Sequence, residues 1–93
     1  MSRLTRAAVG NNYYLADDSK IQHDAEGYTG EAVTKLAKFE NLYEDLLARQ
    51  NDIAKELEAL RLEDKTRTLK FKQLFANKLT NSNILTLFKS YGL

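Results

Sequence analysis

Three carboxylates that lie close together in the chain are the first candidates for chemistry. Glu40, Glu44 and Asp45 fall within six consecutive residues, and two carboxylates that converge in a pocket can act as a general acid and a general base. On a helix, however, these positions point away from the apolar side chains and toward water. We therefore interpret them as part of a charged, solvated helix face and expect no catalytic residues.

Other side chains that carry chemistry are scarce. The chain has no cysteine and a single histidine, His23, so it has no thiol nucleophile, and the paired ligands of a metal site are missing. No serine or threonine is placed with His23 in a pattern that indicates an activated hydroxyl. The four glycines do not have the spacing of a phosphate-binding loop. The sequence predicts that the protein is not an enzyme and has neither cofactor nor metal.

The element that organises the chain is a long amphipathic helix predicted over residues 31–64. Its apolar residues alternate in steps of three and four, which is the period of a coiled-coil seam. The apolar stripe is broad up to Leu47 and narrower beyond it, so we expect a local core first and a second helix or a second chain further along. Gln50 interrupts the seam, where a buried amide needs a partner and fixes the register. The predicted seam, for an oligomer or a partner, is Leu36, Phe39, Tyr43, Leu46, Gln50, Ile53, Leu57 and Leu60.

The remaining segments are predicted to be short elements on either side of this helix. Residues 1–30 form a small β-hairpin that turns at Gly10-Asn11-Asn12, or an irregular segment, and 17–30 is expected to be a loop. After residue 64, two shorter helices are expected at about 67–79 and 83–91, because the run 80–83 is rich in capping residues. The predicted fold is mainly α, a single domain with an N-terminal segment 1–30 and a helical region 31–93.

Charge is distributed unevenly along the chain, although the net charge is only +1. Residues 31–64 hold nine acidic and five basic side chains, whereas residues 65–93 hold six basic and no acidic ones. Such a basic segment can bind nucleic-acid phosphates without sequence preference. The alternative is that this segment folds back onto the acidic helix. We favour this alternative, because the leucines of the segment must also be buried. The candidate contacts to nucleic acid or to an acidic partner are Lys65, Arg67, Lys70, Lys72 and Lys78.

Length and hydropathy limit where and how the protein works. A chain of 93 residues buries only about two-thirds of the surface of its unfolded form, so its own core is thin. No run approaches the roughly 20 apolar residues of a membrane span, and the start of the chain lacks the apolar stretch of a signal peptide. We expect a cytoplasmic protein without a membrane partner.

Three features resemble a widespread group of small proteins encoded by phages and prophages of Gram-positive bacteria. They are the opening Arg3-Leu4-Thr5, the turn glycine Gly10 with the tyrosines that follow it, Tyr13 and Tyr14, and the later Lys35-Leu36-Ala37-Lys38-Phe39-Glu40. Members of the group open with Met-x-Arg-Leu-Thr and later carry a helix start of the form basic-Leu-Ala-x-aromatic-Glu. An Asp-Thr-Gly-Leu segment commonly follows in the group, whereas this chain has Asn41-Leu42-Tyr43, so the helix is expected to continue here. The resemblance implies a phage origin, hence the cytoplasm of the host cell.

These observations lead to three functional hypotheses. The first is a phage-type accessory protein that acts by protein-protein binding, as an inhibitor of a host nucleic-acid-targeting defence complex in the manner of anti-CRISPR proteins. The second is a helical structural protein that forms homo-oligomers through the seam. The third is a nucleic-acid-binding protein that uses the basic C-terminal segment. The expected partner is thus a protein, either a second copy or a host effector, with nucleic acid as the alternative.

Overall fold

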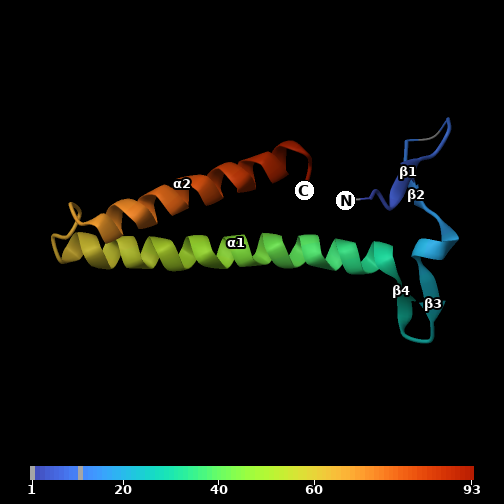
Figure 1. Cartoon of the computed structure of the whole chain (residues 1–93), viewed down its shortest axis with the longest axis horizontal. Coiled ribbons are helices and arrows are strands. Elements are labelled where there is room, and N and C mark those ends of the chain that lie inside the picture. The colour runs from blue at the N-terminus through green and yellow to red at the C-terminus, as the bar shows by residue number, and fades with distance from the viewer. Residues whose placement is uncertain (1, 11) are drawn as a thin grey trace. The chain divides into compact units, whose positions relative to one another are not determined.

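The computed structural model describes residues 2–10 and 12–93 and is mostly helical (Figure 1). The chain divides into two compact units, residues 1–41 and 42–93. The predicted mainly α fold and the small antiparallel region before the long helix are confirmed, whereas the division at residue 30 stays a prediction. In chain order the elements are β1 Thr5–Ala7, β2 Tyr14–Ala16, a 3-10 turn Asp18–Lys20, β3 Gln22–Asp24, β4 Gly27–Thr29, α1 Glu31–Leu62 and α2 Leu69–Ser90.

The first hairpin of the first unit lies where the sequence predicts it. Strands β1 and β2 pair antiparallel, with Arg6 opposite Leu15. The N–H of Ala8 donates to the carbonyl of Tyr13 at 3.0 Å, which closes the ladder. Gly10 has a φ of 75°, a left-handed conformation that glycine adopts without strain. Asn11 of the predicted turn lies outside the described residues.

A second hairpin follows, and it corrects the loop that the sequence predicts for residues 17–30. Strands β3 and β4 pair antiparallel, with His23 opposite Tyr28, and the rings of these two residues lie 4.6 Å apart. The turn is held by Asp24, whose Oδ1 accepts hydrogen bonds from the N–H groups of Glu26 at 2.8 Å and Gly27 at 3.1 Å. Such a side-chain turn is a known use of aspartate. The prediction of a loop fails because these strands have only three residues each and no apolar alternation.

Helix α1 begins directly after β4. A single residue, Gly30, separates the helix from Thr29, the last residue of β4, and it has a φ of 114°. A Cβ at this glycine would lie 2.7 Å from the carbonyl oxygen of Lys20 and 2.8 Å from Oε1 of Gln22. Only glycine therefore allows the chain to pass so close to the preceding segment while it enters the helix. The predicted long helix is confirmed and ends at Leu62, slightly before the expected residue 64.

Helix α1 ends in a Schellman motif that is built on an aspartate. The N–H of Asp64 donates to the carbonyl of Arg61 at 3.1 Å, and the N–H of Lys65 donates to the carbonyl of Leu60 at 2.8 Å. These are the two hydrogen bonds of the motif. Asp64 has a φ of 59°, the left-handed position that glycine usually occupies.

We expect Asp64→Gly to raise the free energy of unfolding by about 0.5–1 kcal/mol, since glycine relieves the left-handed strain and a carboxylate is removed from the negative end of the helix dipole. Chemical denaturation measures the change. Asp64→Ala is the matched control, because it removes the same carboxylate and keeps a Cβ at a positive φ. Equal stabilisation by both variants would show that charge, and not backbone conformation, limits this turn.

Helix α2 is one continuous helix, which corrects the two shorter helices expected at about 67–79 and 83–91. Thr68 caps it, with its hydroxyl oxygen accepting from the N–H of Phe71 at 3.2 Å. Residues 80–83, expected to start a new helix, lie in its interior, where Asn81 and Ser82 are half-buried. The hydroxyl of Ser82 accepts a hydrogen bond from Gln50 of α1, so the preference of these residue types for helix ends is overridden. The helix ends at Ser90, and Gly92, two residues later, has a φ of 81°.

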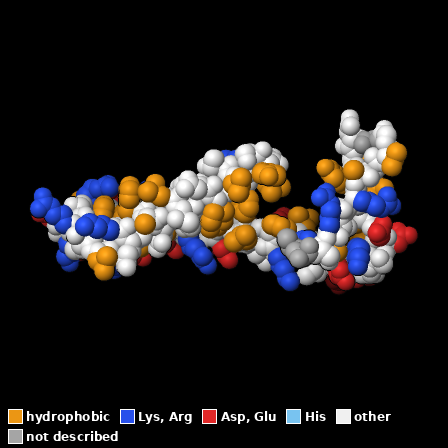
Figure 2. Space-filling model, turned by 45° about the horizontal axis from the view of Figure 1, so that its top comes forward, with side chains coloured by type: hydrophobic (Ala, Val, Ile, Leu, Met, Phe, Trp, Pro, Cys, Tyr) orange, Lys and Arg blue, Asp and Glu red, His pale blue; other side chains and the backbone are white. Residues whose placement is uncertain are grey.

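The apolar core is thin, as the length of the chain predicts. Among the described residues the buried hydrophobic side chains are Ala8, Leu46 and Leu57. Many large apolar side chains remain exposed, and Figure 2 shows hydrophobic groups at the surface over the helices. In the described part of the chain, no helix combines the length and the hydrophobicity that a membrane crossing requires.

Candidate protein-binding site

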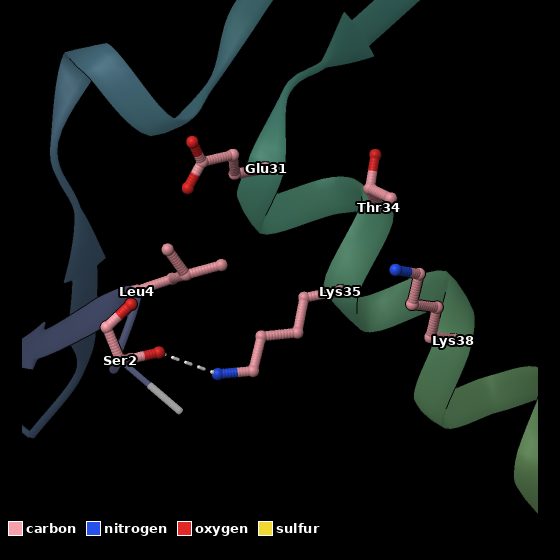
Figure 3. A pocket seen from close by; sticks show the side chains of 6 residues that line it. All are labelled: Ser2, Leu4, Glu31, Thr34, Lys35 and Lys38. Carbon is pink, nitrogen blue, oxygen red and sulfur yellow. Dashed lines mark hydrogen bonds between the residues drawn. The ribbon is translucent and has the colours of Figure 1, made fainter.

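A hollow in the first unit lies between the start of α1 and the residues that precede β1 (Figure 3). Its volume is about 450 Å³. Lys35 points across it, and its Nζ donates a hydrogen bond of 3.1 Å to the carbonyl oxygen of Ser2. This bond connects the start of the chain to the helix. The hollow is lined by Ser2, Leu4, Glu31, Thr34, Lys35 and Lys38.

A second hollow of about 250 Å³ shares Leu4 and Lys35 with the first. Its apolar lining includes two residues of the predicted seam, Leu36 and Phe39, which are 59% and 44% exposed. Together the two hollows form what we call the cationic groove. The second hollow is lined by Arg3, Leu4, Thr5, Ala32, Lys35, Leu36 and Phe39.

The charge around the cationic groove is positive. Its one acidic residue, Glu31, is paired with Lys20 at 3.5 Å between Oε2 and Nζ. The guanidinium of Arg3 lies 5.6 Å from the centre of the Tyr14 ring, a cation–π arrangement that orients the side chain and leaves its charge in place. Lys35 is bonded to a neutral carbonyl, and Lys38 has no ion-pair partner in the described part of the chain. An apolar floor with a cationic rim suits a segment that carries apolar side chains and carboxylates.

Two of the three segments compared above with phage proteins meet in this groove. Arg3, Leu4 and Thr5 come from the opening segment, and Lys35, Leu36 and Phe39 come from the later one. They are about thirty residues apart in the chain. These two segments therefore share one surface, which the sequence does not show.

The rest of the predicted seam lies in the second unit and faces α2 of the same chain. Leu46 and Leu57 are each only 4% exposed, and the rings of Tyr43 and Phe88 lie 6.2 Å apart. The remaining residues of this part, Gln50, Ile53 and Leu60, are half-buried. The expected fold-back of the C-terminal segment is thus what the second unit shows. Contact of the seam with another chain stays a prediction.

Gln50 joins the two helices through hydrogen bonds. Its Nε2 donates to the carbonyl oxygen of Lys78 at 3.1 Å and to Oγ of Ser82 at 2.9 Å. Its Oε1 is buried without a hydrogen-bond partner. The two bonds fix which residues of α2 lie opposite Gln50, whereas the unpaired oxygen reduces stability.

Because of that unpaired oxygen, we expect Gln50→Leu to raise the free energy of unfolding by about 1 kcal/mol, even though two hydrogen bonds are lost. The carbonyl of Lys78 keeps its acceptor role inside the helix. Chemical denaturation measures the change, with Gln50→Ala as the control that removes the amide without filling its space. A loss of stability in Gln50→Leu as large as that in Gln50→Ala would show that the polar contact is a net source of stability.

The basic residues of the C-terminal segment are mostly exposed. Lys65, Arg67, Lys70 and Lys72 face solvent, and Lys78 is half-buried in the helix pair. Lys65 pairs with Glu63 at 3.0 Å between Nζ and Oε2. None of the ion pairs among the described residues joins α1 to α2. The helices are therefore held by apolar contacts and by Gln50, and binding of nucleic acid by these cations stays a prediction.

The carboxylates first considered for chemistry and His23 lie on different elements. Glu40, Glu44 and Asp45 are exposed on α1, as expected for a solvated face. His23 packs against Tyr28 in the second hairpin. In residues 2–10 and 12–93, no group of histidine and carboxylate side chains has the arrangement of a metal site.

Sequence reasoning missed several residues of the groove and of the helix contact. The sequence indicates Leu4, Lys35 and Lys38 of the groove only as parts of the resemblance, because nothing in it shows that the two segments meet. Ser82, the partner of Gln50, lies 32 residues away. Its position in a run of capping residues was the only available signal, and that signal favoured a helix end.

Comparisons of the chain with protein-family models, with curated proteins and with solved structures found no match.

Proposed function

We propose that this protein acts by binding another protein through the cationic groove, as an accessory protein of the phage type. The observation that carries the proposal is the exposure of Leu36 and Phe39 beside Arg3, Lys35 and Lys38. Large apolar side chains grouped beside charged ones are typical of protein-binding surfaces. The resemblance supports the same proposal, because two of its three segments line this groove.

The chemistry of the groove indicates the kind of partner. Leu36 and Phe39 lie on the same side of α1, one turn apart, so they can hold an apolar side chain between them. The cations around them favour carboxylates on either side of that side chain. We infer a partner segment that carries leucine-like or aromatic residues flanked by aspartate or glutamate. A host defence complex is one source of such a segment, in which case binding inhibits the complex.

A third prediction follows from this proposal. We expect Leu36→Glu/Phe39→Glu to abolish retention of a partner from a bacterial host lysate, because the two carboxylates replace the apolar floor and repel an acidic segment. Both side chains are exposed, so the fold should persist, which circular dichroism checks. The matched control is Leu62→Glu/Leu69→Glu, which changes two exposed leucines of the second unit in the same way.

The two variants make the outcome specific. The proposal expects a protein retained by the unmodified chain and by the control, and lost by the groove variant. Retention of nothing beyond the chain itself would contradict it. Equal retention by the groove variant would place the binding surface elsewhere.

A further inference from the structure

The contacts between α1 and α2 define a complete antiparallel register in the second unit. Tyr43 contacts Phe88, and Gln50 binds α2 at Lys78 and Ser82. In antiparallel helices, each step toward the end of α1 is matched by a step toward the start of α2. The register therefore continues with Leu57 opposite Leu74 and Leu60 opposite Phe71.

The residues beside this seam separate the helix pair into two different faces. On α1, Leu47 directly follows the seam residue Leu46, and Ala54 directly follows Ile53. On α2, Phe75 and Ser82 occupy the equivalent positions, directly after Leu74 and Asn81. In an antiparallel pair of helices, equivalent flanking positions lie on the same side. Leu79 is one turn from Phe75 and extends the same side. We call the surface of Leu47, Ala54, Phe75 and Leu79 the apolar face.

The apolar face is exposed. Leu47, Phe75 and Leu79 are 46%, 47% and 53% exposed. Phe75 stacks on Phe71, with ring centres 6.4 Å apart and planes 8° from parallel. Ala54, which is half-buried, leaves room beside it for a large side chain. Bulky residues thus alternate with small ones, Ala54 and Ser82, as in surfaces that interdigitate.

The opposite face of the helix pair is polar at its middle. It contains a hollow of about 350 Å³. The side chains around it are mostly charged or amide groups, which favour water over an apolar partner. The hollow is lined by Arg49, Asp52, Ile53, Asn77 and Asn81.

Charges at the border of the apolar face point to a specific occupant. The α1 side carries Glu44, Glu58 and, at its end, Arg61, which is paired with Glu58, and the α2 side carries Lys72 and Lys89, all exposed. The register places Lys72 at the height of Glu58 and Lys89 at the height of Glu44. We propose that the apolar face binds the same face of a second copy of this chain, giving a four-helix bundle whose two-fold axis runs parallel to the helices.

This axis is the one that the charges favour. It places α1 of one copy over α2 of the other at the same height, so that Glu58 meets Lys72 of the second copy. A two-fold axis across the helices would place α1 over α1 and bring Glu58 toward Glu44 of the second copy, and Lys72 toward Lys89. Like charges at such positions oppose association. Within one chain, Glu58 is bonded to Arg61 at 3.1 Å between Oε2 and Nη1.

The size of the face is sufficient for a weak, specific dimer. From Tyr43 to Arg61 it extends about 27 Å and is two helices wide, about 20 Å, so two copies bury roughly 1,000 Å². This area is at the lower end of specific protein interfaces, about 1,000–1,200 Å². We therefore expect a dissociation constant on the order of micromolar.

Sedimentation equilibrium of the full chain, between about 1 and 100 μM, tests the proposal around that micromolar constant. We expect a reversible monomer–dimer equilibrium that Leu79→Glu weakens at least about tenfold, since a charge is buried against an apolar surface. Leu62→Glu is the matched control and should associate as the unmodified chain does. Circular dichroism verifies that the variants remain helical.

Charge reversal tests the axis. Glu58→Lys and Lys72→Glu should each weaken the dimer, and an equimolar mixture of the two variants should associate as strongly as the unmodified chain. The mixture restores both pairs only between different chains, so an effect inside one chain cannot produce this result. A monomer at all concentrations, or equal association of Leu79→Glu and the unmodified chain, would overturn the proposal. Stronger association of Glu58→Lys alone would overturn the parallel axis.

Discussion

Leu57→Ala is expected to lower the free energy of unfolding of the second unit by about 2–4 kcal/mol. Leu57 is one of two leucines of α1 that are almost fully buried in this unit, and its removal leaves a cavity between the helices. A pair of helices with so small a core has little stability to lose. We therefore expect most of the helical signal to disappear at 37 °C, as circular dichroism would show.

The control for this variant is Leu62→Ala, which removes the same atoms from an exposed position of the same helix. Its effect should stay within about 0.5 kcal/mol. Equal effects of the two variants would mean that Leu57 is not covered by α2, and the register derived from Gln50 and Tyr43 would be wrong.

Gly30→Ala is expected to destabilise the first unit by about 2–4 kcal/mol, because two costs combine. The residue has a φ of 114°, which strains any side chain by about 1–3 kcal/mol. The added Cβ would also lie 2.7 Å from a backbone oxygen of Lys20, which cannot rotate away. The amides of β3 and β4 should lose hydrogen-exchange protection, since this contact holds the turn that precedes β3 against the start of α1.

Gly27→Ala separates the two costs. Gly27 also has a positive φ, 142°, but an added Cβ there meets nothing within 4 Å. Its substitution should therefore cost clearly less than that of Gly30. Equal loss of protection in both variants would show that backbone strain alone accounts for the effect, without the close approach to Lys20.

The long helix and the first hairpin are predictable from sequence because their signals are local. The steps of three and four from Leu36 to Leu60 require no knowledge of the partner helix. The turn near Gly10 is indicated by residues that accept a positive φ. Other features depend on contacts between distant segments. The run 80–83 remains helical because Ser82 meets Gln50, and local propensity cannot show this.

The candidate site is likewise predictable from sequence only in part. Leu36 and Phe39 were predicted as the beginning of a seam, and their exposure agrees with a surface that needs a partner. The groove itself requires Leu4 and Arg3 to lie against α1, which depends on both hairpins. The β3–β4 hairpin was not predicted, because its main signal is the single turn aspartate, Asp24.

Photo-crosslinking at position 39 tests the central claim most directly, namely that the cationic groove binds a protein. The residue p-benzoylphenylalanine replaces Phe39 in one sample and Leu62 in another, and each chain is irradiated in host lysate. The account predicts a covalent product at position 39, in which mass spectrometry maps the link to a segment with apolar and acidic residues. Absence of a product at position 39, or the same product from position 62, would contradict it.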